Sequence, residues 1–518
     1  MPRDSVSDAD YRLDMTSPHR APLLIRSLLG LSLLIVASAC ATPLQSQVEA
    51  ALANPDQTGI RWGVVVADMD GTELLSINAD SRFTPASNTK VVTTMASYHH
   101  LDTLSSEALN PGTKVVLDPD PEGGPPDLIL IGGGDAMLTD RPDCEAYCLS
   151  DLADQVAETG LTEIDQIVGD DTFFAFERWG VGWSVEDLQF YYGTAISALS
   201  VNDNLVWVEV SPGAVEGEAA RAEWQAGDTL YDLNNQIVTS ASETKRRLRV
   251  ERFPGASTVR LYGEIPVDAA PVRLRLAIET SAEFTARRFA ALLEARGISV
   301  AGTGTRHRPL TLADEPPEPE DEAPASIAAL TKALSPVTPI AQLAGSPLTE
   351  SLARISKDSE NLHADIALRR LGRLDGTGSR LHGVAALEAF LDEAGLPETG
   401  YAFHGGSGMS IYNRISPRAM VQLLAFAADQ DWFEAWRADQ PIGGVDGSLE
   451  RRFSGTPLEG KIFAKTGTLN GANALSGVLV AASGRELLFS IIANDRPAST
   501  RSAIPEMDAA LNLIAAAY

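Results

Sequence analysis

Strand-forming segments stand at both ends of this 518-residue chain, and their placement constrains its fold more than any other feature. Residues 61–80 alternate apolar and polar positions around Asp70-Gly71, a pair typical of a tight hairpin turn. Near the other end, three strand-like segments span residues 460–470, 474–482 and 485–494, and a helical pattern follows. We therefore expect an α/β domain in which the two ends of the chain complete one sheet.

The middle of the chain has a different character. Residues 110–310 hold many short strand-like pieces separated by glycine and proline, whereas helical patterns resume at 348–372 and 382–396. Residues 312–326 are acidic and rich in proline, which predicts a solvated connector that does not pack. The expected organisation is a discontinuous α/β domain, residues 43–108 and 326–518, split by β-rich accessory domains at residues 109–325.

The charge balance excludes one class of partner. Lys and Arg total 41 against 70 Asp and Glu, which gives a formal net charge of -29. Binding to nucleic acid requires a basic surface for the phosphates, so we expect no nucleic-acid partner. Such acidity is instead typical of a soluble, strongly hydrated surface.

The N-terminus has the pattern of an export signal. Residues 28–39 form a short apolar run after two arginines, and a run of this length is too short to span a bilayer. It fits the apolar core of a signal peptide over residues 1–40. Two processing sites are open: cleavage after Ala37-Ser38-Ala39, or lipidation of Cys40 as the first mature residue. We expect a periplasmic or cell-envelope protein, with a lipid anchor in the second case.

The other two cysteines, Cys144 and Cys148, lie four residues apart. In an exported chain a local disulfide is the favoured state, because oxidising compartments keep cysteines paired. A metal site is the rival, but neither histidine nor a further cysteine stands nearby to complete it. We therefore expect a disulfide and no metal.

A serine and a lysine three residues apart open a helical pattern in the stretch PASNTK at residues 85–90. Positions three apart share one face of a helix, so Lys90 can reach the hydroxyl of Ser87. A serine is a weak nucleophile that needs such a base, and burial can keep a lysine neutral enough to serve. Taken alone, the spacing is a weak signal and favours an ordinary helix N-cap at Ser87.

Two later motifs favour the nucleophile. Ser359 and Asn361 form S-x-N, and residues 465–468 read KTGT on a strand-like segment. The set S-x-x-K, S-x-N and K-T-G, in this order, is the signature of penicillin-recognising serine acyltransferases. In such a site Ser359 can relay a proton to the leaving amine, and Asn361 can bond the substrate amide. The carboxylate-binding candidates follow on the strand: Lys465, Thr466 and Thr468, with Gly467 letting the substrate lie close.

Ser359 lies 272 residues after Ser87, a far larger gap than in simple carboxypeptidases or class A β-lactamases. In this spacing the chain resembles the DacB-like family of low-molecular-mass class C penicillin-binding proteins, which carry an insertion there. Segments at 132–138, 168–174, 191–204, 406–417 and 443–453 look like members of that family. The resemblance implies a penicillin-binding-protein/β-lactamase-like transpeptidase domain, with an antiparallel sheet flanked by helices.

The same resemblance implies a function. It predicts a serine D-Ala-D-Ala carboxypeptidase and endopeptidase without metal or cofactor, acting on peptidoglycan stem peptides and inhibited by β-lactams. The backbone N–H groups of Ser87 and Thr468 would form its oxyanion hole. Two positions depart from the family pattern: Glu360 and Gly405 stand where the family usually has Asp.

Three alternatives stay open at the level of sequence. One is a β-lactamase or esterase on the same fold, and another is a non-catalytic envelope binding protein. The third is a Ser-His-Asp hydrolase built on the GGSGM segment at 405–409, with His363 or His404 as its base. That segment lacks the second glycine of a nucleophile elbow, so we expect structural or pocket-lining roles for both histidines.

Overall fold

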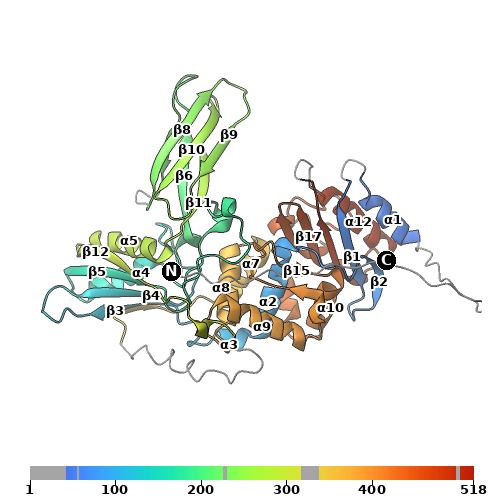
Figure 1. Cartoon of the computed structure of the whole chain (residues 1–518), viewed down its shortest axis with the longest axis horizontal. Coiled ribbons are helices and arrows are strands. Elements are labelled where there is room, and N and C mark those ends of the chain that lie inside the picture. The colour runs from blue at the N-terminus through green and yellow to red at the C-terminus, as the bar shows by residue number, and fades with distance from the viewer. Residues whose placement is uncertain (1–42, 55–57, 226–229, 317–337, 498–501) are drawn as a thin grey trace, which may run out of the picture. The chain divides into compact units, whose positions relative to one another are not determined.

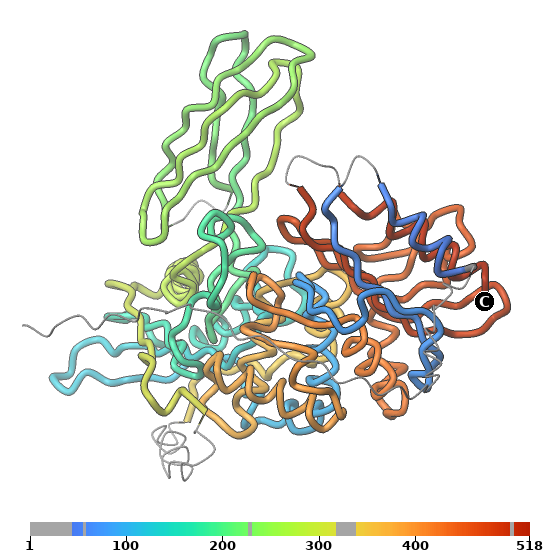
Figure 2. Tube along the Cα trace, turned by 45° about the vertical axis from the view of Figure 1, so that its right-hand side comes forward, coloured from blue at the N-terminus to red at the C-terminus, as the bar shows by residue number. Residues whose placement is uncertain are grey.

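Both ends of the chain contribute strands to one antiparallel sheet (Figure 1). Its order is β16-β17-β18-β1-β2, so the N-terminal hairpin completes a sheet begun by the three C-terminal strands. β1 pairs with β18 from Arg61↔Asn494 to Ala67↔Leu488, and Figure 2 shows the blue and red traces side by side. The strands are β1 (Arg61–Ala67), β2 (Glu73–Ile77), β16 (Ile462–Leu469), β17 (Ala472–Val480) and β18 (Glu486–Asn494).

The computed structural model describes residues 43–54, 58–225, 230–316, 338–497 and 502–518. The predicted signal peptide and Cys40 lie outside the described residues. The described elements belong to the unit formed by residues 42–518. Among them, no helix combines the length and the apolar character needed to cross a membrane.

The five-stranded sheet is buried on both faces because its strands carry apolar residues in both registers. Val64 and Val66 belong to the core formed with the terminal helices, whereas Val65 and Ala67 face the larger helical layer. The terminal helices α1 (Pro43–Leu52) and α12 (Ile504–Ala517) pack together. The opposite layer contains α2 (Thr89–His99), α3 (Leu101–Leu104), α7 (Leu348–Lys357), α8 (Asn361–Leu371), α9 (Arg380–Glu393), α10 (Pro417–Ala428) and α11 (Phe433–Ala438).

The insertion contains helices as well as strands, and in this the expectation from sequence was incomplete. A mixed sheet of order β12-β5-β4-β3-β13 packs against α4 (Leu149–Glu158) and α5 (Ser281–Glu294). Both helices are amphipathic. The glycine and proline residues around them led to a prediction of strands alone for this part of the sequence. The strands are β3 (Thr113–Asp118), β4 (Asp127–Gly132), β5 (Glu163–Asp170), β12 (Ser299–Arg306) and β13 (Ala341–Leu343).

Two three-stranded sheets make up the rest of the insertion (Figure 1). Their orders are β8-β10-β9 and β11-β6-β7, and one apolar core joins them to the mixed sheet. The strands are β6 (Leu205–Ser211), β7 (Arg221–Trp224), β8 (Asp232–Ser240), β9 (Arg247–Glu251), β10 (Thr258–Pro266) and β11 (Val272–Ala277). The short elements are η2 (Ala86–Asn88), η3 (Val185–Asp187), η4 (Tyr191–Gly193), η5 (Asn202–Asn204), η6 (Leu312–Asp314), η7 (Glu398–Gly400), η8 (Gly447–Leu449), β14 (Tyr401–Ala402) and β15 (Arg414–Ile415).

Two predicted boundaries need correction. Strand β13, residues 341–343, pairs with β3 of the insertion, so the insertion continues past the expected limit of residue 325. The predicted connector at 312–326 also begins as packed structure. Its first residues form η6, where Asp314 is buried and accepts hydrogen bonds from Arg308 and Thr377. The stretch from 317 to 337 lies outside the described residues.

The helical pattern at 348–372 is interrupted where a single helix would be expected. α7 ends at Lys357 and α8 begins at Asn361, and between them Ser359 adopts a φ of +63°. A left-handed residue breaks a helix, because the following backbone turns away from the helical axis. The S-x-N motif therefore lies at a sharp turn between two helices.

Candidate active site

Ser87 lies in the short turn η2, immediately before α2. The α-helix begins at Thr89, and no side-chain cap hydrogen bond forms at the start of either element, so the N-cap interpretation of Ser87 was wrong. Ala86, just before Ser87, has a φ of +51°, a region that costs free energy for a residue with a Cβ. Backbone strain of this kind persists only where the surrounding packing holds it in place. Strained residues are found most often at functional sites.

Two glycines let neighbouring backbone segments pack against this turn. A Cβ at Gly467 of β16 would lie 2.4 Å from the carbonyl oxygen of Pro85. A Cβ at Gly408 would lie 2.0 Å from the carbonyl oxygen of Ala86. Asn88 adds a hydrogen bond of 2.5 Å from Nδ2 to the carbonyl oxygen of Lys465. The KTG strand and the 405–409 loop therefore hold the Ser87 turn on two sides.

Lys90 is fully buried and bonds three partners. Its Nζ lies 3.1 Å from Ser87 Oγ, 2.5 Å from Asn361 Oδ1 and 2.6 Å from the carbonyl oxygen of Ser407. Burial lowers the pKa of Lys90 to about 7, although the charges of Asp365 and Glu360 act in the opposite direction. At neutral pH a large fraction of Lys90 is therefore unprotonated and able to accept a proton from Ser87.

A second buried lysine mirrors the first. Lys465 Nζ donates to Ser359 Oγ at 3.0 Å and to the carbonyl oxygen of Thr466 at the same distance. Its pKa lies well below the ordinary lysine value, first because of burial and then because of the nearby positive charge of Lys90. Each motif serine is thus paired with one lysine, and the charge of Lys90 disfavours protonation of Lys465.

Asn361 connects the motifs to the insertion. Its Oδ1 accepts from Lys90, and its Nδ2 donates to the backbone carbonyl of Tyr192 at 2.7 Å. A side-chain amide carries two N–H groups, so one remains for a substrate carbonyl. The insertion therefore orients a residue of the second motif directly.

An open cleft of about 360 Å³ joins the predicted residues. Ser87, Ser359, Asn361 and Thr468 line it, whereas Lys90 and Lys465 are buried behind the two serines to which they donate. The Thr466 hydroxyl bonds Ser448, and neither Thr466 nor Gly467 is among the lining residues. The insertion supplies further lining residues: Asp187, Tyr191 and Tyr192.

The three motifs thus meet at one cleft, and comparison with known proteins identifies the family. The family model described as D-Ala-D-Ala carboxypeptidase 3 (S13) matches residues 44–313 and 322–517, which is most of the chain. The chain belongs to the S13 family.

Individual relatives agree with this assignment. A D-alanyl-D-alanine carboxypeptidase of Actinomadura sp. (strain R39) is 32% identical over 491 residues, covering 91% of this chain and 85% of that protein. Penicillin binding protein 4 (dacB) of Haemophilus influenzae superposes with a TM-score of 0.73 at 20% identity, covering 91% of this chain and 98% of that chain. The predicted fold, a penicillin-binding-protein-like α/β domain split by an insertion, is confirmed. The chain is a serine-type D-Ala-D-Ala carboxypeptidase, a hydrolase.

The two departures from the usual S13 pattern have different surroundings. Glu360 lines the cleft, and burial raises the pKa of its carboxyl group. Gly405 is buried, and a Cβ there would lie 3.4 Å from Oδ1 of Asp365. Asp365 also accepts the backbone N–H of Gly406 at 2.9 Å. A carboxylate therefore stands beside position 405 although that residue is glycine.

The Ser-His-Asp alternative does not fit the geometry of this S13 site. Ser407 is buried, and its backbone carbonyl, not its hydroxyl, faces Lys90. His363 bonds Ser351 and Asp203 instead of Ser87, and His404 is not among the cleft-lining residues. Both histidines thus belong to the surroundings of the site.

Sequence reasoning missed several groups that hold the motif residues. They include the carbonyls of Ser407 and Tyr192, and the side chains of Asn88 and Asp203. Every residue has a backbone carbonyl, so the sequence does not indicate which carbonyls bond the site. The sequence did show that segments 191–204 and 406–417, which contain Tyr192 and Ser407, resemble the family. That resemblance pointed to the two segments but not to what their carbonyls bond.

The structure joins Cys144 and Cys148 in a disulfide. The loop between them carries Tyr147, whose hydroxyl donates to both carboxylate oxygens of Glu350 on α7 at 3.0 and 3.1 Å. The pair lies away from the cleft lining. The Tyr147–Glu350 contact, not the disulfide, ties this surface loop of the insertion to the helical layer.

Proposed function

We propose that Ser87 is the nucleophile of this carboxypeptidase and that Lys90 is its general base. The observation that carries the proposal is the contact of 3.1 Å between Lys90 Nζ and Ser87 Oγ, made by a fully buried lysine whose pKa is about 7. A buried neutral amine at hydrogen-bond distance is what a serine needs to attack a carbonyl at neutral pH.

The reaction proceeds through an acyl-enzyme. Ser87 Oγ attacks the carbonyl carbon between the two terminal D-alanines of a peptidoglycan stem, and its proton moves to Lys90 Nζ. The backbone N–H groups of Ser87 and Thr468 stabilise the developing oxyanion. The proton then reaches the leaving amine through Ser359, the C–N bond breaks, and water later hydrolyses the ester.

Binding of the substrate would favour the neutral form of the base. The terminal carboxylate binds beside Lys465, with the hydroxyls of Thr466 and Thr468 as further donors. A carboxylate raises the proton affinity of Lys465, whereas the resulting positive charge lowers that of Lys90. The substrate thereby helps to deprotonate the base that its own cleavage requires.

β-Lactams should acylate Ser87 because they present a strained amide beside a carboxylate. A D-amino-acid cross-link differs from a free terminus only in the group beyond the scissile bond, so we propose both carboxypeptidase and endopeptidase activity. A β-lactamase would share the acylation step and differ in rapid hydrolysis of the ester. The lifetime of the acyl-enzyme separates the two.

The test uses the full chain, benzylpenicillin and intact-protein mass spectrometry. Native protein should gain one penicillin mass on Ser87, and Ser87→Ala should gain none. Ser97→Ala is the matched control, because Ser97 lies on α2, the helix that follows the Ser87 turn, donates to the carbonyl of Thr93 and does not line the cleft. An adduct in Ser87→Ala, or none in native protein, would exclude the proposal. Release of the adduct within seconds would favour a β-lactamase.

We also propose export to the periplasm through the segment before residue 43. Cleavage after Ala39 would leave a free N-terminus, whereas the alternative would leave a diacylated Cys40. Mass analysis of the mature N-terminus from cell envelopes distinguishes the two. Retention of residues 1–36 in the mature protein would exclude export by either route.

A further inference from the structure

Three consecutive residues of the insertion adopt a left-handed conformation. Asn202, Asp203 and Asn204 have φ values of +53°, +57° and +54°. Such runs are rare because each residue with a Cβ resists this region, and they persist only where surrounding contacts hold them. Asn204 supplies part of that hold, since its side chain donates to the carbonyl of Ala195 at 2.9 Å and to Ser200 Oγ at 3.0 Å.

The middle residue, Asp203, extends its carboxylate to two helices of the catalytic domain. Oδ2 accepts from Arg354 Nη2 at 3.1 Å, and Oδ1 lies 3.1 Å from His363 Nε2. Arg354 is in the last turn of α7, and His363 is in the first turn of α8. The Asp203 side chain is only 14% exposed and His363 is fully buried, so water competes little for these bonds.

The two partners of Asp203 flank the turn that carries the second motif. The carbonyl of Arg354 accepts the N–H of Asp358 at 3.1 Å, directly before the left-handed Ser359. His363 is two residues beyond Asn361 and is held on its other side by Ser351 at 2.9 Å. Displacement of either partner would shift the start of the turn or its end.

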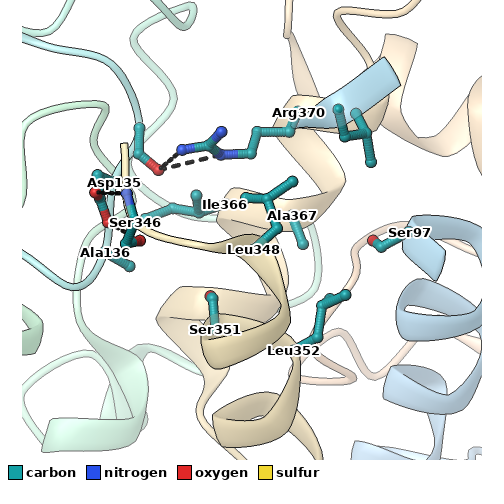
Figure 3. A pocket seen from close by; sticks show the side chains of 12 residues that line it. Ser97, Asp135, Ala136, Ser346, Leu348, Ser351, Leu352, Ile366, Ala367 and Arg370 are labelled. Carbon is teal, nitrogen blue, oxygen red and sulfur yellow. Dashed lines mark hydrogen bonds between the residues drawn. The ribbon is translucent and has the colours of Figure 1, made fainter. Parts of the chain in front are cut away.

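Contacts at the other ends of the two helices come from the insertion as well (Figure 3). Asp135 accepts both the N–H and the hydroxyl of Ser346, which lies just before α7. Arg370, near the end of α8, donates to the carbonyl of Gly134 at 2.9 Å. The insertion thus holds the outer ends of both helices through Asp135 and Gly134, and their inner ends, beside the 358–360 turn, through Asp203.

We propose that Asp203 is a positioning residue for the reaction. Through Arg354 and His363 it holds the turn so that Ser359 Oγ meets Lys465 and Asn361 Oδ1 meets Lys90. Asp203 does not line the cleft, so it would act through its two partners and not on the substrate directly. The inference rests on the proposed function, because it assigns Asp203 an effect on the acylation of Ser87.

A purely structural ion pair is the competing explanation, and Asp314 offers a matched comparison. Asp314 is also an insertion aspartate that accepts from an arginine, Arg308, at 2.7 Å. It likewise bonds a residue outside the insertion, Thr377 of the loop between α8 and α9, but its side chain bonds neither motif. Loss of the charge at either position should affect stability, whereas only Asp203 should affect the chemical step.

The experiment compares Asp203→Asn, Arg354→Gln and Asp314→Asn in the full chain. Asparagine keeps the shape of aspartate but cannot accept from both donors. Benzylpenicillin concentration series separate the dissociation constant of the initial complex from the rate constant of acylation. For Asp203→Asn and Arg354→Gln we expect acylation slower by about tenfold or more, with the dissociation constant changed less than about twofold. Asp314→Asn should acylate within about twofold of native protein.

Hydrogen–deuterium exchange adds a local readout. In Asp203→Asn, peptides that cover residues 356–366 should exchange faster, while peptides from α10 should not change. Acylation of Asp203→Asn at the native rate would overturn the inference, and so would equal slowing in Asp314→Asn. Failure of native protein to form any adduct would instead exclude the proposed function, so the two failures are distinguishable.

Discussion

The pH dependence of acylation gives the strictest test of Lys90 as the base. Burial lowers the pKa of Lys90 from 10.5 to about 7. The neutral fraction is then about 10% at pH 6, about 50% at pH 7 and about 90% at pH 8. The acylation rate constant should therefore rise about tenfold from pH 6 to pH 8 and then level off. With an ordinary lysine it would rise about a hundredfold over that interval and continue beyond pH 9.

Other titrating groups face Lys90 and need separate controls. Asp365, Glu360 and Lys465 all interact with it, and burial raises the pKa of Glu360 above its ordinary value. The control variant is Glu360→Gln. If Lys90 is the titrating group, removal of this negative charge moves the midpoint to lower pH because Glu360 favours the charged lysine. If Glu360 itself titrates, the step disappears.

The assay is quenched-flow acylation by benzylpenicillin from pH 5.5 to 9.5, read by protein mass, with Ser87→Ala as the blank. Thermal melting at each pH confirms that the protein stays folded. A rate constant that still rises in proportion to hydroxide at pH 9 would refute the argument. A profile that is flat across the whole range would refute it as well.

The pH dependence of the free energy of unfolding provides a second test of the lowered pKa of Lys90. Between pH 7 and 10.5 the unfolded chain binds a proton at Lys90 that the folded chain releases, so the free energy of unfolding rises with pH. A shift from 10.5 to about 7 corresponds to about 5 kcal/mol across that window. Lys90→Met removes this contribution, and urea unfolding at pH 7 and pH 9.5 should show a weaker increase in the variant. An unchanged increase would contradict the assigned pKa.

Three further predictions follow from other contacts. Gly467→Ala brings a Cβ to 2.4 Å from the Pro85 carbonyl, so it should lower the free energy of unfolding by about 1–3 kcal/mol and slow acylation. Thermal melting and penicillin acylation check both effects. Lys465→Ala should raise KM for D-Ala-D-Ala peptides by about tenfold or more, yet change hydrolysis of an ester without a carboxylate far less. Replacing Cys144 and Cys148 by serine opens a short loop, which should cost about 2 kcal/mol in urea unfolding and leave acylation unchanged.

The sequence predicted the parts of the fold that depend on local pattern. Alternation around Asp70-Gly71 gave the hairpin, and three apolar runs gave the C-terminal strands. The break at Ser359 was missed because its cause is tertiary. A left-handed serine between α7 and α8 is held by contacts from distant segments, and helical propensity continues through it. The helices α4 and α5 were missed because glycine and proline around them dominated the pattern.

For the site, the motif order predicted which residues meet but not their environment. Motifs cannot reveal that Lys90 and Lys465 are both buried, nor that each bonds a different serine. The lowered pKa of Lys90 arises from that burial, so the chemistry depends on packing that no spacing encodes. Asp203 escaped notice for a related reason, since an aspartate in an NDN loop resembles an ordinary turn residue.

The insertion is large, yet it contributes directly to the site. The entropic cost of a long loop grows only logarithmically with its length, and this insertion has its own apolar core. It also packs on α8, where Leu362 and Ile366 join a cluster with Phe174 and Ile196. The carbonyl of Tyr192 also accepts a hydrogen bond from Asn361. Through these two contacts the insertion packs directly against the second motif. A shortened chain without it would leave Asn361 unsupported, so we expect the insertion to be required for acylation itself as well as for substrate choice.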